Sequence, residues 1–260
     1  MPFMTIHGIS SYYEIAGEGD PVLFIHGLGS STRDWEDQVA EFRKNYQVIT
    51  TDLRGHGRTG KPKGPYSISM FADDVAELIQ KRCDKPVHVI GLSMGAATAF
   101  HLSIDYPGMV RTAVITNMSA AMPVQTFAQK KMYYARVLTV KLFGMRKMGR
   151  VIASNVFKKP DQKALRTLLE DRWAENEKKP YLASLAALKN WTVMDRLSLI
   201  NCPVLVVHSE NDYSPLGHKK DYTQRIPKGK LVEIPDTGHI VNMEKPDVYN
   251  RIVRDFLAAH

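Results

Sequence analysis

The chain has 260 residues, of which 44% are hydrophobic and 24% are charged. This balance is typical of a soluble globular protein and excludes a fibrous or disordered chain, and the length fits one α/β domain with a single insertion. The net charge of +8 is unevenly distributed: residues 120–194 contain 15 Lys and Arg against 5 Asp and Glu, whereas the rest contains 20 against 22. We therefore expect a local basic surface.

The N-terminus has no basic start, apolar stretch or small-residue cleavage site of a secretory signal, so we expect a cytoplasmic protein. The 19 residues from Pro86 to Ile104 contain no Asp, Glu, Lys or Arg, but their glycines predict a strand, a turn and a buried helix, not a membrane span. The two cysteines, Cys83 and Cys202, form no CxxC pair and no zinc-spaced cluster. We expect both to be reduced thiols, and no metal site.

Short β-rich runs alternate with helical patterns along the chain, which predicts a mainly parallel sheet with crossover helices. The turn residues GEGD at 17–20 predict an antiparallel hairpin at the N-terminal edge. The eight expected strands are Thr5–Ile9, Tyr12–Ile15, Val22–His26, Val48–Asp52, Val87–Ile90, Val110–Thr116, Val204–His208 and Leu231–Ile234.

Helical signals complete this pattern. Ser67 is a candidate N-cap for an apolar stripe that starts at Ile68, and Pro246 occupies the first turn of a C-terminal helix. Between Thr116 and Val204 the apolar period becomes helical over a length too great for a simple crossover. We expect residues 1–119 and 195–260 to form the core, and residues 120–194 to form a basic helical lid at the C-terminal edge of the sheet, where ligands bind in open α/β folds.

The sequence GLSMG at 91–95 places Ser93 between a strand and a helix, which is the context of a nucleophile turn. A serine hydroxyl needs a base to take its proton, and the base needs a partner that fixes its tautomer. Asp212 closes the strand that begins at Val204, and His239 follows the last strand. The chain order Ser, Asp, His therefore predicts a catalytic triad.

The motif HGLG at 26–29 follows the strand at Val22, so the backbone N–H groups of Leu28 and Met94 could together bind an oxyanion. With DLRGHGRT at 52–59, ENDYSP at 210–215 and TGH at 237–239, these motifs resemble the α/β-hydrolase superfamily. The resemblance covers nearly the whole chain except the lid. It implies an eight-stranded sheet whose second strand is antiparallel, a lid after the sixth strand, and no cofactor.

A serine at position 93 argues against the similar haloalkane dehalogenases and epoxide hydrolases, which have aspartate there. We expect a carboxylesterase that forms an acyl-enzyme with a lipophilic ester. Thioesters or esters on an acidic carrier protein, lactones, carbon–carbon bonds and a non-catalytic ligand-binding role stay open as alternatives. Candidate substrate-binding residues, chosen for their closeness to the motifs, are Trp35, Met118, Met122 and Ile240, in addition to Leu28 and Met94.

Other assignments are weaker. Asp236 and Asp195 are alternative triad acids, and His208 and His218 are too near Asp212 in sequence to be the base. Residues 55–60 match GxGxxG, but no helix follows, so nucleotide binding is not expected, and nucleic acid lacks a motif.

The segment 127–152 mixes apolar and basic residues. We interpret it first as a solvated lid helix that covers the active site, and alternatively as a surface for anionic lipid or an acidic carrier. The basic residues that would form this surface are Lys130, Lys131, Arg146 and Lys147.

Overall fold

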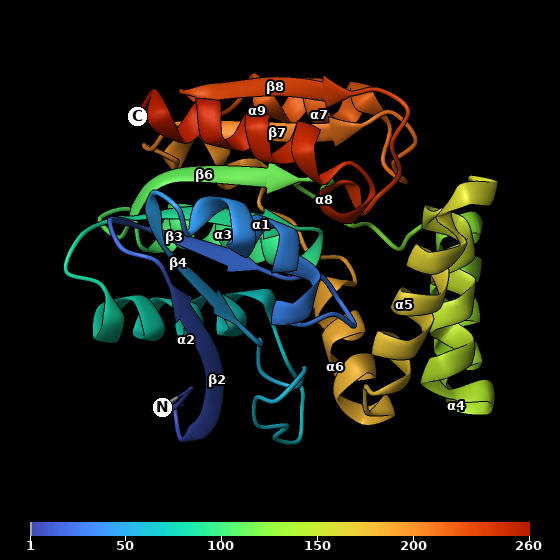
Figure 1. The fold of residues 1–260 in the computed structure, drawn as a ribbon. Coiled ribbons are helices and arrows are strands. Elements are labelled where there is room, and N and C mark those ends of the chain that lie inside the picture. Colours follow the sequence, from blue (N-terminus) through green and yellow to red (C-terminus); the bar gives the residue numbers. More distant parts are fainter. Residues whose placement is uncertain (1) are drawn as a thin grey trace.

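The computed structural model describes residues 2–260. Eight strands form one sheet in the order β1-β2-β4-β3-β5-β6-β7-β8 (Figure 1). From β4 to β8 all neighbours are parallel, and β2 is antiparallel to both β1 and β4, as expected for this fold. The strands are β1 Phe3–Ile6, β2 Ile9–Ala16, β3 Asp20–Ile25, β4 Tyr46–Thr51, β5 Val87–Leu92, β6 Val110–Thr116, β7 Val204–Ser209 and β8 Gly229–Ile234.

The N-terminal hairpin differs from the prediction. Its turn lies at His7 and Gly8, inside the run assigned to one strand, and both residues have positive φ (43° and 75°). Two central residues in the left-handed region suit the twist of a tight hairpin, and glycine adopts this region without steric cost. Residues 17–19 instead connect β2 to β3, which are separated by β4 in the sheet.

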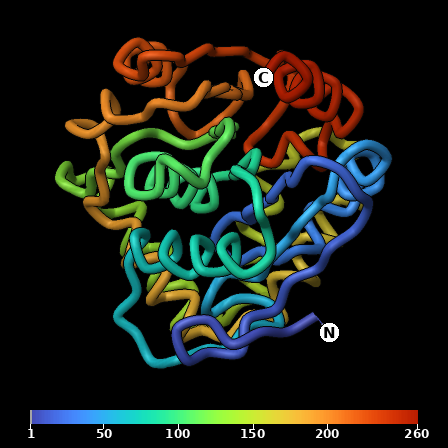
Figure 2. The backbone as a smooth tube through the Cα atoms, turned by 90° about the vertical axis from the view of Figure 1, so that its left-hand side faces the viewer, coloured from blue at the N-terminus to red at the C-terminus, as the bar shows by residue number. Residues whose placement is uncertain are grey.

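Helices cover both faces of the sheet (Figure 2). On one face α2 (Ile68–Arg82) packs on α3 (Met94–Asp105), and on the other α1 (Glu36–Phe42) packs on α9 (Pro246–Ala258). The Ser67 side chain accepts a 3.0 Å hydrogen bond from Met70 N–H, and Pro246 begins α9, so both predicted helix starts are confirmed. The remaining short elements of the core are η1 Thr32–Trp35, η3 Met194–Leu199, α7 Leu216–Thr223 and α8 Val241–Glu244.

Between β6 and β7 the chain forms a separate helical segment at the end of the sheet toward which the parallel strands point (Figure 1). It contains α4 (Phe127–Val156), η2 (Pro160–Gln162), α5 (Lys163–Ala174) and α6 (Lys178–Leu188). Gly144 interrupts the helical backbone of α4 with φ 81°. None of the helices within residues 2–260 combines the length and the apolar character needed to cross a bilayer.

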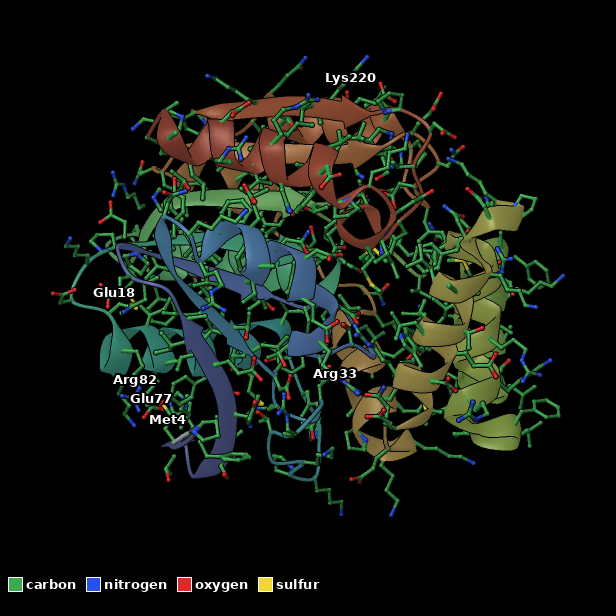
Figure 3. The ribbon with its side chains drawn as sticks, in the orientation of Figure 1. Met4, Glu18, Arg33, Glu77, Arg82 and Lys220 are labelled. Carbon is green, nitrogen blue, oxygen red and sulfur yellow. The ribbon has the colours of Figure 1, made fainter. Side chains whose placement is uncertain are left out.

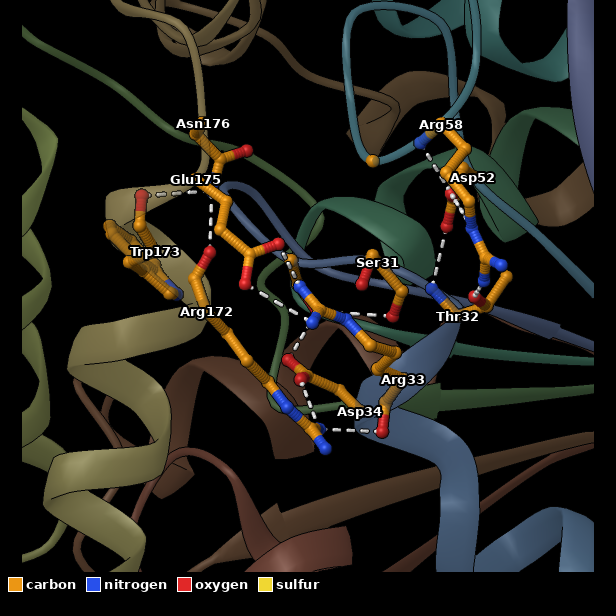
Figure 4. Close-up of polar contacts among 12 residues, drawn as sticks. Ser31, Thr32, Arg33, Asp34, Asp52, Arg58, Arg172, Trp173, Glu175 and Asn176 are labelled. Atoms are coloured by element: carbon orange, nitrogen blue, oxygen red, sulfur yellow. Dashed lines mark hydrogen bonds and ion pairs between the residues drawn. The ribbon is translucent and has the colours of Figure 1, made fainter.

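The C-terminal end of α5 and the turn that follows it attach this segment to the loop after β3 (Figure 4). Arg172 donates to the Arg33 carbonyl at 2.6 Å and to Asp34 Oδ1 at 3.1 Å, and Arg33 pairs with Glu175 at 2.5 Å. Arg33 lies on the side of the core that faces α5 and α6 (Figure 3). Because Arg172 and Asp34 are largely buried, solvent screens this pair less than the exposed Arg33–Glu175 pair.

Candidate active site

Ser93 lies on the sharp turn between β5 and α3, with φ 53° and ψ −117°. A non-glycine residue in this region is strained, and such strain persists only where the surrounding structure holds it. Its N–H donates to the Thr116 carbonyl at 2.9 Å, which ties the turn to the end of β6. The Ser93 hydroxyl is thereby held at the C-terminal edge of the sheet.

The two glycines of the motif make the turn possible. A Cβ atom on Gly95 would collide with the backbone carbonyl of Ile25, and one on Gly91 would collide with the backbone of Gly95. Neither neighbour is a flexible side-chain end, so α3 can approach β3 and β5 this closely only if both positions lack a side chain.

Asp212 and His239 follow β7 and β8, respectively, and come into contact although 27 residues separate them. Asp212 Oδ1 lies 2.5 Å from His239 Nδ1, and its second oxygen accepts a hydrogen bond from the Ser214 hydroxyl at 2.6 Å. Burial disfavours the charge on Asp212, but His239 and Lys219 outweigh it and hold the pKa of this carboxyl well below its ordinary value. The alternative acid Asp236 is exposed and pairs with Lys159.

Sequence reasoning did not identify Lys219, a lysine with 0% exposure. Its ammonium lies 2.7 Å from Asp212 Oδ2, 3.0 Å from His208 Nδ1 and 3.2 Å from Asn117 Oδ1. Burial lowers the pKa of Lys219, and Asp212 opposes that shift. Buried lysines are rare unless they are paired. The positive charge of Lys219 therefore offsets the negative charge of Asp212.

Asn117, directly after β6, is a second residue that the sequence did not identify as part of the site. Its amide nitrogen donates to the His239 carbonyl at 2.8 Å and to the Ser209 hydroxyl at 2.8 Å, while Oδ1 accepts from Ser209 N–H at 2.9 Å. The side chain thus joins the ends of β6 and β7 to the loop that carries His239. The sequence signal that could have identified it is a polar residue directly after a strand of the parallel sheet.

Ser93, Asp212 and His239 line one cavity of about 490 Å³ between the sheet edge and the inserted helices. The Tyr213 ring lies 4.6 Å from the His239 ring, centroid to centroid. The volume is in the range of small-molecule sites, and most of the wall is apolar. Apolar lining residues include Leu28, Met118, Met132, Ile152, Trp173 and Leu188.

The loop after β3 brings Leu28 to this cavity. Within residues 2–260, neither the Leu28 nor the Met94 N–H donates a hydrogen bond to another residue. Trp173 of α5 packs 3.0 Å from the position of a Cβ on Gly29, and Asn176 donates to the Gly29 carbonyl at 2.8 Å. The inserted segment therefore supports the backbone of this loop.

Two buried histidines also support the loop. His26 Nε2 accepts from Leu53 N–H at 3.0 Å, and the two imidazole rings of His26 and His56 lie 5.1 Å apart, centroid to centroid. Burial lowers the pKa of His26 to about 4 and that of His56 to about 3. Both are therefore neutral structural groups at pH 7.

The candidate substrate-binding residues divide into two groups. Met118, Met122 and Ile240 line the cavity. Trp35 does not: it is fully buried against Phe24, 5.0 Å between ring centroids, because η1 turns its side chain into the core.

The basic residues of α4 differ in their contacts. All four are exposed, but Arg146 pairs with Asp171 of α5 at 2.6 Å, whereas Lys130, Lys131 and Lys147 have no ion-pair partner within residues 2–260. Arg146 thus joins two helices within the segment. A docking role for the three lysines stays a prediction.

Cys83 and Cys202 are free thiols, as expected.

Comparison with known proteins agrees with this architecture. The chain is 26% identical over 256 residues to 3-oxoadipate enol-lactonase 2 of Acinetobacter baylyi, covering 96% of this chain and 94% of that protein. The enol-lactonase of Burkholderia xenovorans LB400 superposes with a TM-score of 0.91 at 24% identity, covering 99% and 100%. An esterase of Thermogutta terrifontis, solved with malate bound, gives 0.87 at 24% identity, covering 100% and 97%. Residues 20–246 match the alpha/beta hydrolase fold family, and the chain therefore belongs to this family.

Proposed function

We propose that the protein is a serine hydrolase of carboxylic esters. Ser93 would be the nucleophile, His239 the general base, and Asp212 the acid that orients His239. The observation that carries the proposal is the 2.5 Å contact between His239 Nδ1 and Asp212 Oδ1 in the same cavity as the strained Ser93. Nucleophile, base and orienting carboxylate together are the set that acyl transfer requires.

In the proposed reaction, Ser93 Oγ attacks the ester carbonyl carbon while His239 Nε2 takes its proton. The negative charge that develops on the carbonyl oxygen is stabilised by the N–H groups of Leu28 and Met94. The alcohol then leaves with the proton from His239, and a water molecule activated by His239 hydrolyses the acyl-enzyme and restores Ser93.

The apolar cavity wall supports a lipophilic acyl group as substrate. Residues of α4, α5 and α6 contribute to this wall, which supports a lid role for residues 120–194. Lactone hydrolysis is a second candidate, because it uses the same three groups and because the Acinetobacter relative is named an enol-lactonase.

The test is hydrolysis of p-nitrophenyl esters of increasing acyl length by the native protein and by Ser93→Ala, with Ser154→Ala as a matched control. Ser154 lies on α4 with its hydroxyl bonded to the Arg150 carbonyl. Loss of a triad serine typically lowers turnover by about a millionfold. We expect turnover to disappear only in Ser93→Ala, and an organophosphonate to label Ser93 covalently.

Equal turnover by native protein and Ser93→Ala would refute the proposal. Phosphonate labelling without ester turnover would point to lactones, carrier-bound acyl groups or carbon–carbon bonds. No labelling and no turnover would favour a ligand-binding role.

A further inference from the structure

The charges that line the cavity do not balance. Its acidic residues are Asp34 and Asp212, and its basic residues, other than His239, are Arg136 and Lys189. Asp212 is compensated by Lys219 and His239, as described above. Asp34 is compensated by Arg172, whose guanidinium lies 3.1 Å from Oδ1, and it also accepts a hydrogen bond from Ser30.

Arg136 has no such partner. No carboxylate of residues 2–260 lies within ion-pair distance of its guanidinium, whereas Arg146, Arg150 and Arg172 of the same segment all pair with carboxylates. Arg166, also in this segment, donates to three backbone carbonyls. Arg136 is thus an arginine at the cavity whose charge the described chain leaves uncompensated.

The Arg136 side chain is nevertheless held in place. Its Nε donates to the hydroxyl of Tyr181 at 2.5 Å, and its guanidinium carbon lies 5.5 Å from the Tyr181 ring centroid and 5.8 Å from that of Trp173. Tyr181 and Trp173 are both buried. The two terminal nitrogens donate no hydrogen bond within residues 2–260, so they form a positioned fork of free donors.

Lys189, at the end of α6, adds a second positive charge to the same cavity. Its ammonium lies 5.3 Å and 5.5 Å from the ring centroids of Tyr133 and Tyr134, and it too has no carboxylate partner among the residues that the structure describes. An aromatic face attracts a cation but has no net charge that would offset it. The cavity therefore carries a net positive charge from α4 and α6.

We infer that Arg136, assisted by Lys189, binds a carboxylate on the substrate, so that the substrate class is a carboxylate-bearing ester or lactone with an apolar chain. A guanidinium fork matches a carboxylate bidentately. One fork and one ammonium in a largely apolar wall suit a monoanion, because a phosphate dianion would need more donors to offset its desolvation. This inference rests on the proposed ester hydrolysis.

The test compares two substrates of equal shape: mono-p-nitrophenyl glutarate, and its neutral isostere in which an isopropyl group replaces the carboxylate. The measured quantity is the ratio of kcat/KM for the anionic ester to that for the neutral ester. The ratio is insensitive to the fraction of folded protein, because both esters are measured on the same sample. It therefore reports on charge recognition even if a variant is less stable.

We expect Arg136→Met to lower this ratio about tenfold to a hundredfold, the typical value of a hydrogen-bonded charge pair, and Arg136→Lys to lower it less. Arg150→Met is the matched control, because Arg150 lies on the same helix, pairs with Glu170 at 2.7 Å and does not line the cavity. Its ratio should equal that of the native protein. A ratio that does not change in Arg136→Met, with the neutral ester still hydrolysed, overturns the inference and leaves the proposed function intact.

A binding measurement separates the two proposals. Calorimetric titration of Ser93→Ala with monomethyl glutarate should show binding that Arg136→Met abolishes in the same background. That result upholds the anion subsite even if no ester is hydrolysed, in which case the proposed function alone fails. Absence of binding to Ser93→Ala, or equal binding after Arg136→Met, overturns the subsite.

Discussion

Replacing Lys219 with glutamine should destabilise the folded protein. The Lys219 ammonium lies 2.7 Å from one Asp212 oxygen, and His239 Nδ1 lies 2.5 Å from the other. In the native protein the positive charge of Lys219 offsets the buried negative charge of Asp212. Glutamine keeps N–H donors but removes the charge, so Asp212 is left buried without its lysine partner.

The size of the effect follows from the burial of this ion pair. The Lys219 and Asp212 side chains are 0% and 1% exposed. Breaking a buried ion pair by removing one partner typically costs about 3–5 kcal/mol, because the remaining charge stays buried without compensation. The free energy of unfolding, measured by urea titration, should therefore fall by about 3 kcal/mol in Lys219→Gln.

The control is Lys220→Gln, because Lys220 is the next residue yet projects from the outer surface (Figure 3). Its free energy of unfolding should equal that of the native protein to within about 0.5 kcal/mol. His208 lies 3.0 Å from Lys219 and faces Glu233 at 3.8 Å, so it could take up a proton when Lys219 loses its charge. Adding His208→Gln closes this route. A double variant as stable as the native protein would refute the electrostatic role of Lys219.

Two further predictions concern stability, and urea unfolding tests both. Gly95→Ala should lower the free energy of unfolding by about 3 kcal/mol or prevent folding, because the new methyl group collides with the Ile25 carbonyl. The control is Gly217→Ala, whose methyl group meets nothing within 4 Å and which should be neutral or slightly stabilising. Equal stability of the two variants would contradict the reasoning. Burial lowers the pKa of His26 to about 4 and that of His56 to about 3 in the folded state, against about 6.5 in the unfolded chain. The contribution of these neutral histidines to stability is therefore fully present above about pH 6.5, and it is lost progressively as the pH falls toward the two folded-state pKa values. The unfolding midpoint should therefore fall between pH 7 and pH 4.5, and a midpoint independent of pH would exclude this contribution.

Local patterns predicted much of the fold. Each of these patterns depends on a few neighbouring residues: the alternation of strands with amphipathic helices, the N-cap Ser67 and the glycine-flanked Ser93. The structure has these elements where they were expected. The N-terminal hairpin was misassigned because the glycine-rich turn at 17–20 gave a stronger turn signal than His7 and Gly8. Turn chemistry identifies a reversal of the chain but not which strand pairs across it.

The parts of the site that could not be predicted depend on contacts between distant residues. Lys219 meets Asn117 across 102 positions, and a lone lysine in a helix is ordinarily a solvated surface residue. Trp35 was placed near the substrate because it follows the HGLG motif, but η1 turns its side chain into the core. Arg136 differs from the other arginines of its segment because, within residues 2–260, it has neither a carboxylate nor a carbonyl partner. The sequence does not show such partners.

The contacts of α5 bear on how a substrate could enter. Trp173 and Asn176 contact Gly29, and Arg172 binds the Arg33 carbonyl, so the end of α5 is fastened to the loop that carries Leu28 (Figure 4). If the whole segment swung away from the core, the backbone proposed to bind the oxyanion would lose this support. Arg146 and Arg150, on the part of α4 after Gly144, pair with Asp171 and Glu170 of α5, so entry that preserves these contacts requires movement of residues 127–143 alone. The non-helical Gly144 divides α4 and provides a position where such a movement could be absorbed, with α5 remaining attached to the core.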